Sequence, residues 1–516
     1  MKLRNLAIVF CAASALLAAC GSSDDSGSVA SGGGGVGGKS TGGAAGKGGG
    51  SGKGGGAGLE SAGAGGEAGS VEAAGAGGVT GEGGEGGAAA IVDAFTVTLA
   101  NVAPTKLFTS SGVFNTPVGD LSAGAATPGK TYKFTVDAGR KQKLFFATML
   151  AATNDLFFAP SGDGIPLYLD NGTPITADVT SQVYLWDAGT ELNEEPFLGP
   201  NTVTKQAAPN TGPVDTNTSV RKIGDVTEGF VFTYPAVSSM LKVTVTHTTG
   251  TLFDITIDDL VGAALTTSDA VSHPLPISPG VWVMSGAANA LFTAGMPAPA
   301  HGLESIAEDG NPATLGTYAA MTSGITYPAS PGVWLTHKTG SKPLFTTGVA
   351  DYGKGIEAIA EDGNAAPLGA SLASLDGYLT GAIFNTPIGA VAPGPILPGS
   401  QYSFTFNASP GDSLSFASML AATNDVFFAP QDGGIPLFDA NNAPTTGDVS
   451  SQIYLWDAGT EGNEEPGIGP NTVTNQLAPN TGTPGEGKVQ LLSAVTTDTY
   501  SYPSAQSVLK VTISAK

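Results

Sequence analysis

Cysteine is almost absent from this 516-residue chain, since its only two, Cys11 and Cys20, both lie within the first twenty residues. Disulfides are therefore excluded from the rest of the chain, which depends on apolar cores or on a bound metal ion for stability. Histidine is also scarce, with four in the chain. Without cysteines or paired histidines, a zinc site is not expected.

Charge is scarce and one-sided. Charged residues make up 13% of the chain, and the formal net charge is −23. A chain with no cluster of Lys and Arg is a poor partner for nucleic acid. It is also repelled by anionic lipid unless a bound cation changes the local sign.

Catalytic signatures and long apolar runs are missing as well. The chain has no nucleophile elbow, phosphate loop or metal-protease helix, so we predict that it is not an enzyme. After the first twenty residues, no stretch reaches the ~18 consecutive apolar residues of a membrane-spanning helix.

Residues 1–20 are typical of a bacterial export signal. Lys2 and Arg4 precede an apolar run over 6–17 that is too short to stay in a membrane. The run ends in Leu-Ala-Ala-Cys, which resembles a lipobox and implies cleavage before Cys20 and lipid on that cysteine. An ordinary signal peptide with a chance cysteine is the alternative. We expect a lipid-anchored protein of the cell envelope, at the outer membrane or cell surface.

Residues 21–90 consist of Gly, Ala and Ser with scattered Lys and Glu. Such a segment cannot bury enough apolar surface to fold. As a flexible coil of about 70 residues it has an r.m.s. span on the order of 45 Å. We interpret it as a disordered tether.

A long segment of the remaining chain occurs twice. With an offset of 270 residues, about seven positions in ten are identical between 144–212 and 414–482. Alternating apolar and polar residues, as in Phe95-Thr-Val-Thr-Leu99, predict short strands between Pro-Gly and Asn-Gly turns. We therefore predict an all-β fold with tandem antiparallel β-sandwich domains at 91–247 and 251–516.

The second predicted domain carries an extra block that is itself duplicated, at 278–316 and 330–369. Each copy has a Ser-Pro-Gly-Val-Trp turn and a short helix that Gly310 or Gly363 ends. We expect the glutamates of these helices to be solvated. Two arrangements are consistent with the sequence: the block 278–316 folds back to complete the first sandwich, or it is a local duplication inside the second.

Acidic residues gather in the repeated loops. Asp187 and Glu191 follow an aromatic strand, and Asp155 lies in a loop directly after another strand. If both strands end at the same edge, three carboxylates converge, and without a cation they repel strongly. Glu194 or Glu195, or a backbone carbonyl near them, could complete the shell of a bound cation. We hypothesise one Ca²⁺ per copy, since calcium prefers carboxylate oxygens. The alternative is a turn capped by the aspartate. The predicted ligands are Asp155, Asp187 and Glu191, and Asp425, Asp457 and Glu461.

Several separated motifs resemble the spondin amino-terminal domain of F-spondin and mindin. They are Asn-Asp-Leu-Phe-Phe-Ala-Pro at 154–160, Trp-Asp-Ala-Gly-Thr-Glu at 186–191, their second copies at 424–430 and 456–461, and the helix block at 302–310. The resemblance implies a β-sandwich with calcium bound at one end and a role in adhesion. The chain departs from the animal pattern in lacking cysteines and in having Glu191 and Glu461 where that pattern has Asp.

From the motifs and the resemblance together we predict a cell-surface lipoprotein that binds an extracellular or matrix protein or glycan with the help of calcium. Two copies on one tether suit multivalent binding. The alternatives are an enzyme acting on extracellular polysaccharide and a passive envelope component.

Overall fold

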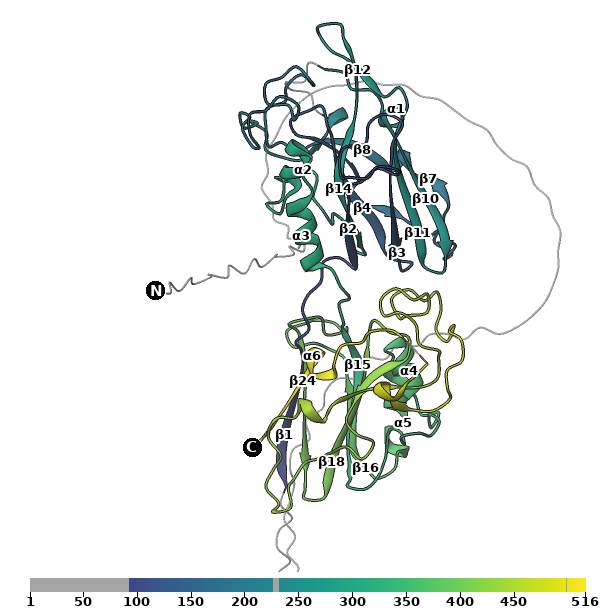
Figure 1. Ribbon diagram of the computed structural model, residues 1–516. Helices are drawn as coiled ribbons and strands as arrows, with labels where there is room; N and C mark the ends of the chain where they lie inside the picture. Colours follow the sequence, from purple (N-terminus) through teal and green to yellow (C-terminus); the bar gives the residue numbers. More distant parts are fainter. Residues whose placement is uncertain (1–91, 226–231, 498) are drawn as a thin grey trace, which may run out of the picture. The chain divides into compact units, whose positions relative to one another are not determined.

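The computed structural model describes residues 92–225, 232–497 and 499–516. The predicted signal peptide, Cys20 and the predicted tether lie outside the described residues. The predicted fold class is confirmed, because the chain forms antiparallel sheets with a few short helices. These sheets make two sandwiches, each with one four-stranded and one seven-stranded sheet (Figure 1).

The first sandwich contains the strands β2 to β14 and the helices α1 to α3. Its smaller sheet has the order β3 (Thr131–Asp137), β11 (Leu252–Asp259), β10 (Leu241–Thr249), β7 (Ala177–Asp178). Its larger sheet has the order β2 (Ser110–Phe114), β14 (Ile277–Ser285), β4 (Lys143–Leu150), β5 (Leu156–Pro160), β8 (Val183–Asp187), β9 (Arg221–Lys222), with β6 (Ile165–Pro166) paired to β4. The other elements are a ribbon of β12 (Ala264–Thr266) and β13 (Ser272–Pro274), and the helices α1 (Val237–Met240), α2 (Leu303–Asp309) and α3 (Ala313–Thr322).

The second sandwich contains β1 and the strands from β15 to β24. Its smaller sheet has the order β17 (Gln401–Ala408), β1 (Asp93–Asn101), β24 (Leu509–Ala515), β21 (Gly447–Asp448). Its larger sheet has the order β16 (Tyr378–Phe384), β15 (Ala329–Lys338), β18 (Asp412–Leu420), β19 (Val426–Ala429), β22 (Tyr454–Asp457), β23 (Gln490–Leu491), with β20 (Ile435–Pro436) paired to β18. Its α-helices are α4 (Ile356–Asp362), α5 (Ala366–Ser371) and α6 (Ala505–Val508).

The burial of each strand follows from its two faces. Every second residue of β1 is buried, because only one face of its sheet meets the core. In contrast, β4 is almost continuously buried. Phe146 points into the core between the two sheets, whereas Phe145 and Ala147 lie in the core beneath α2 and α3. Figure 1 shows these two helices against the larger sheet of the first sandwich.

The chain does not complete one sandwich before it begins the other. The N-terminal strand β1 pairs with β17 and β24, so it belongs to the second sandwich. Figure 1 shows it, at the purple end of the colour scale, beside the yellow β24. In the first sandwich the equivalent strand is β11. It follows β10 in the chain and pairs with β10 and β3. The first sandwich is therefore a circularly permuted version of the second, inserted after the strand β1.

Strand pairing overturns the predicted division into 91–247 and 251–516. The boundary falls in the hairpin between β10 and β11, which are neighbours in one sheet. The block 278–316 folds back on the first sandwich: β14 pairs with β2 and β4, and Leu303 and Ile306 pack in the same core as Trp186. The fold-back arrangement is thus the observed one. The helix stops are also confirmed, since Gly310 and Gly363 end α2 and α4 in the left-handed conformation.

Candidate functional site

The predicted acidic residues do meet at one edge of each larger sheet. Strand β5 begins directly after Asp155 and β8 ends at Asp187, and the two strands pair so that Leu156 lies opposite Asp187. In the second sandwich, Val426 lies opposite Asp457 in the same way. Because β5 runs antiparallel to both β4 and β8, β4 and β8 end at the same edge, as the predicted convergence requires, and β18 and β22 do so in the second copy.

All six predicted ligands are buried, at 0–5% exposure. Each lies where the local fold forces a turn. The first aspartate of each set lies in the tight connection between two paired strands, and the glutamate faces the returning loop near Gly212 or Gly482. Burying this many acidic groups is costly without compensating donors or a cation. Their hydrogen bonds therefore decide what the site can do.

Asp187 caps a turn, as the alternative interpretation of this loop required. Its Oδ1 accepts a hydrogen bond from the backbone N–H of Gly189 at 2.7 Å, and Asp457 does the same for Gly459 at 2.5 Å. The Oδ2 atom of Asp187 accepts from the Asn193 amide at 2.7 Å, matched by Asn463 and Asp457 at 2.8 Å. Turn capping by the aspartate is thus observed in both copies.

The glutamate of each set fastens the long acidic loop. Glu191 Oε1 accepts from the Gly212 N–H at 2.7 Å, whereas its Oε2 has only a 3.3 Å contact with the Asn154 amide. Glu461 shows the same pattern, with a 2.7 Å bond from Gly482 and a 3.4 Å contact from Asn424. One oxygen of each glutamate is therefore held firmly and the other weakly.

The first aspartate of each set has an unsatisfied oxygen. Oδ2 of Asp155 accepts from the Glu191 N–H at 3.3 Å, but its Oδ1 is buried without a hydrogen-bond partner among the described residues. Asp425 Oδ1 is orphaned in the same way. Burial, followed by the negative charge of Asp187, raises the pKa of Asp155 well above its usual value. Burial and the charge of Asp457 do the same to the pKa of Asp425.

Helices α2 and α4 add a fourth carboxylate that sequence reasoning placed wrongly. Glu308 and Glu361 were expected to be solvated, yet they are 1% and 2% exposed. Burial, with a contribution from Glu191, raises the pKa of Glu308 to about 8. Burial and the charge of Glu461 raise the pKa of Glu361 to about 7. Both glutamates belong to an Ala-Glu-Asp-Gly sequence that is repeated at the ends of the two helices. This repeat was the available sequence signal, but it does not show that the glutamate faces the sheet.

Glu194 and Glu195 each hold a loop of the first sandwich through hydrogen bonds. Glu194 accepts from the backbone and side-chain N–H groups of Asn201 at 2.7 and 2.6 Å. Glu195 accepts from the N–H and hydroxyl of Ser268 at 2.5 and 2.8 Å. Both therefore close loops through bonds to other parts of the first sandwich.

The two acidic sites differ in the residue that lies opposite the second aspartate on the neighbouring strand. In the first sandwich Arg221 lies opposite Asp187 on the neighbouring strand, and its Nη2 donates to Asp187 Oδ2 at 2.7 Å. The corresponding position opposite Asp457 in the second sandwich is the neutral Gln490. Its amide donates instead to Glu486 at 3.1 Å.

Trp186 and Trp456 are core residues. They are 2% and 0% exposed, and their indole N–H groups donate to the carbonyls of Ala159 and Ala429. They pack against Phe292 and Phe345, respectively, with ring centroids 4.9 and 4.7 Å apart. Their position fixes the strand end from which the acidic loop starts.

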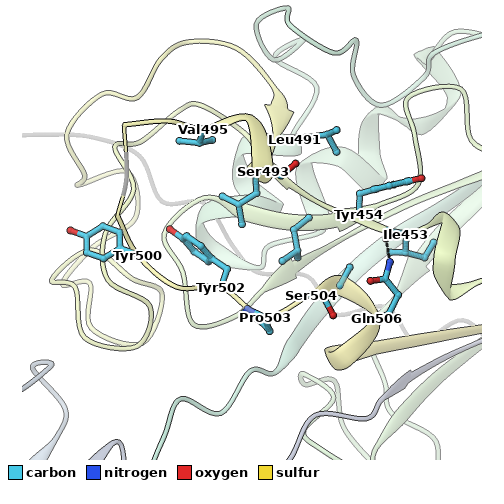
Figure 2. Close-up of a pocket in the computed structure, with 13 residues that line it drawn as sticks. Ile453, Tyr454, Leu491, Ser493, Val495, Tyr500, Tyr502, Pro503, Ser504 and Gln506 are labelled. Carbon is cyan, nitrogen blue, oxygen red and sulfur yellow. Dashed lines mark hydrogen bonds between the residues drawn. The ribbon is translucent and has the colours of Figure 1, made fainter.

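A pocket of about 440 Å³ lies in the second sandwich, between β22, β23 and the segment that leads to α6 (Figure 2). Tyr454, Tyr500 and Tyr502 line it together with Leu491. The Gln506 amide donates to the Ile453 carbonyl at 2.9 Å and holds one side of the pocket. This combination of tyrosine rings and polar groups suits a ligand with both apolar and hydroxyl surfaces.

Within 92–225, 232–497 and 499–516, no group of three or more Asp, Glu, His or Cys side chains is arranged so that it could hold a metal ion. In the same ranges, no helix has both the length and the apolar character to cross a membrane. Comparison of the chain with protein-family models and with curated protein sequences found no match to either.

Proposed function

We propose that the chain is an exported, lipid-anchored binding protein with two spondin-like sandwiches, in which calcium stabilises the acidic loops that contact an extracellular or matrix partner. The observation that carries the proposal is the orphaned Oδ1 of Asp425, buried beside Asp457 and near Glu361 and Glu461. A buried carboxylate oxygen without a donor is stable only if it is protonated or if a cation is bound.

The residues of the second sandwich fit calcium by chemistry. Four buried carboxylates offer the hard oxygen ligands that calcium prefers. The ligands there would be Asp425, Asp457 and Glu461, with Glu361 as a further acidic neighbour. Because no ready shell exists among the described residues, binding requires side-chain movement. The weakly held Oε2 of Glu461 is the atom most easily released for it.

The partner site is proposed at the pocket of the second sandwich. The start of β22, the strand that ends at Asp457, lines this pocket together with Tyr500 and Tyr502 (Figure 2). Tyrosine rings bind sugars and peptide side chains by stacking and by hydroxyl hydrogen bonds. A loop end fixed by calcium would hold this pocket in shape.

We expect calcium to stabilise the purified protein against heat. With a dissociation constant of about 10 µM, 1 mM calcium adds roughly 2.7 kcal/mol to the free energy of unfolding. For a sandwich of this size, that raises the melting temperature by about 5–11 °C. Scanning calorimetry with calcium and with EDTA measures the shift. Asp425→Asn should abolish it, and Asp376→Asn, which changes an exposed aspartate, should leave it intact.

The competing enzymatic function makes a different demand. Hydrolysis of a polysaccharide needs carboxyl groups that reach the glycosidic bond, whereas the clustered carboxylates are 0–5% exposed. We therefore expect no hydrolysis of matrix glycans by the purified protein. Release of reducing ends that Asp425→Asn abolishes would contradict the binding function.

A further inference from the structure

The first acidic site contains a cationic residue at a position where the second has a neutral one. In the first sandwich the Arg221 guanidinium sits inside the cluster, with a side chain 15% exposed beside the fully buried Asp187. The register of β8 and β9 places Arg221 opposite Asp187. The register of β22 and β23 places Gln490 opposite Asp457. The same location therefore holds a cation in one copy and a neutral amide in the other.

The first copy is built around this cation. Arg221 Nη2 also donates to Asp215, and its Nη1 donates to the carbonyl of Asn217 at 2.5 Å. Asp215 belongs to the loop between the bridge at Val214 and β9, and the second copy has a loop one residue shorter, with Gly485 at the corresponding position. The second sandwich thus lacks the acceptor Asp215, and its loop is one residue shorter than the loop that orients the guanidinium.

From this difference we infer that Arg221 acts as an internal cation that takes the place of calcium in the first sandwich, so that the chain binds one calcium ion, in the second. The inference rests on the proposed function. Both oxygens of Asp187 already accept hydrogen bonds, from Gly189, Asn193 and Arg221. A divalent ion at Asp187 would also stand next to a fixed positive charge in a buried, poorly screened location.

The second site has a neutral residue where the first has a cation. Asp425 Oδ1 is fully buried and has no hydrogen-bond partner among the described residues, and the same holds for Asp155 Oδ1 in the first site, so the two copies differ in the cation and not in the unsatisfied aspartate oxygen. The position that a guanidinium fills in the first copy is Gln490, whose amide is directed to Glu486. The acidic cluster is therefore accompanied by an unpartnered buried oxygen and has no cation at the matching position on β23.

Calorimetric titration of the purified whole chain with calcium chloride tests the inference through the number of ions bound. The wild type should bind one ion, and Asp425→Asn should bind none, whereas Asp155→Asn should still bind one. Arg221→Gln, which gives the first site the residue of the second, should bind two. Gln490→Arg should weaken the remaining site at least 100-fold.

Conservative variants separate charge from folding damage. Arg221→Lys keeps the positive charge and should still bind one ion, and circular dichroism of each variant reports whether the sandwiches are folded. Two ions in the wild type, or one that Asp155→Asn removes, would overturn the role of Arg221 while leaving calcium binding in place. No ion in the wild type would overturn the proposed function, and the inference with it.

Discussion

Residues 251–516 produced alone are expected to be unfolded, although they span one complete predicted domain, whereas residues 105–326 are expected to fold. The fragment 251–516 lacks β1, an interior strand of the smaller sheet. Phe95, Val97 and Leu99 of that strand are 0–1% exposed. At about 1.5–3 kcal/mol for each buried side chain, their loss removes roughly 5–9 kcal/mol. The whole stability of a domain is only about 5–15 kcal/mol.

The fragment 105–326 contains all the paired strands of the first sandwich, from β2 to β14, and both covering helices. Its ends lie together, because Lys106 N–H donates to the Thr326 hydroxyl at 3.2 Å and Leu107 N–H donates to the Thr322 carbonyl at 3.0 Å. Thermal unfolding followed by circular dichroism should show one cooperative transition for 105–326 and none for 251–516.

A circularly permuted fragment gives the matched control. In the second sandwich Lys516 N–H donates to the Ala94 carbonyl at 2.9 Å, so the end of β24 adjoins the start of β1. Residues 327–516 followed by a short turn and residues 92–103 should therefore fold, in the order that β10 and β11 already have. The same permuted fragment with Val97→Asp should not fold. A cooperative, monomeric 251–516 with Trp334 buried would show that the strand assignment is wrong.

The local features of this fold could be predicted from the sequence, and its connectivity could not. Alternation at Phe95-Thr-Val-Thr-Leu99 identifies a strand with one buried face. It does not say which strand pairs with it, because β1 and β11 carry the same pattern and fit the same place in two sandwiches. A usable signal was the match between Phe95, Val97 and Leu99 and the series Phe253, Ile255 and Ile257.

The acidic site shows the same limit. Asp155, Asp187 and Glu191 could be grouped from the sequence because the strands beside them are recognisable. Glu308 lies 117 residues beyond Glu191 and enters the site only through the docking of α2 on β4 and β5. Arg221 lies beyond a long loop and reaches Asp187 only through the pairing of β8 with β9. Contacts between distant parts of the chain place both Glu308 and Arg221 in the site. The spacing of residues along the sequence does not show these contacts.

Asp259→Asn is expected to stabilise the first sandwich by about 2 kcal/mol at pH 9, or roughly 4–8 °C in melting temperature. Asp259 is 1% exposed at the end of β11, and neither of its carboxyl oxygens has a hydrogen-bond partner among the described residues. Its equivalent in the second sandwich is Asn101, whose amide donates to the carbonyls of Tyr327 and Ile396 at 2.8 and 3.0 Å. This position thus favours a side chain that donates hydrogen bonds to carbonyl oxygens. An ionised carboxylate can only accept them.

The pH dependence has a defined sign. Burial raises the pKa of Asp259 to about 8, from an ordinary value of 3.8. Between these two values the folded state keeps a proton that the unfolded state has released. The contribution of Asp259 to stability is therefore fully present below about pH 3.8 and is lost as the pH rises through about 8. Melting of the fragment 105–326 between pH 4 and 9 should show this decline, and Asp259→Asn should reduce it.

The reverse substitution supplies the control, because Asn101→Asp should create the same defect in the second sandwich. A carboxylate there loses both donated bonds and faces two carbonyl oxygens, which we expect to cost about 3–5 kcal/mol at pH 9. Acid should relieve the loss, because a protonated carboxyl can again donate one bond. If Asp259→Asn leaves the pH profile of the first sandwich unchanged, Asp259 is ionised and hydrated in the folded protein, and the correspondence with Asn101 does not extend to hydrogen bonding.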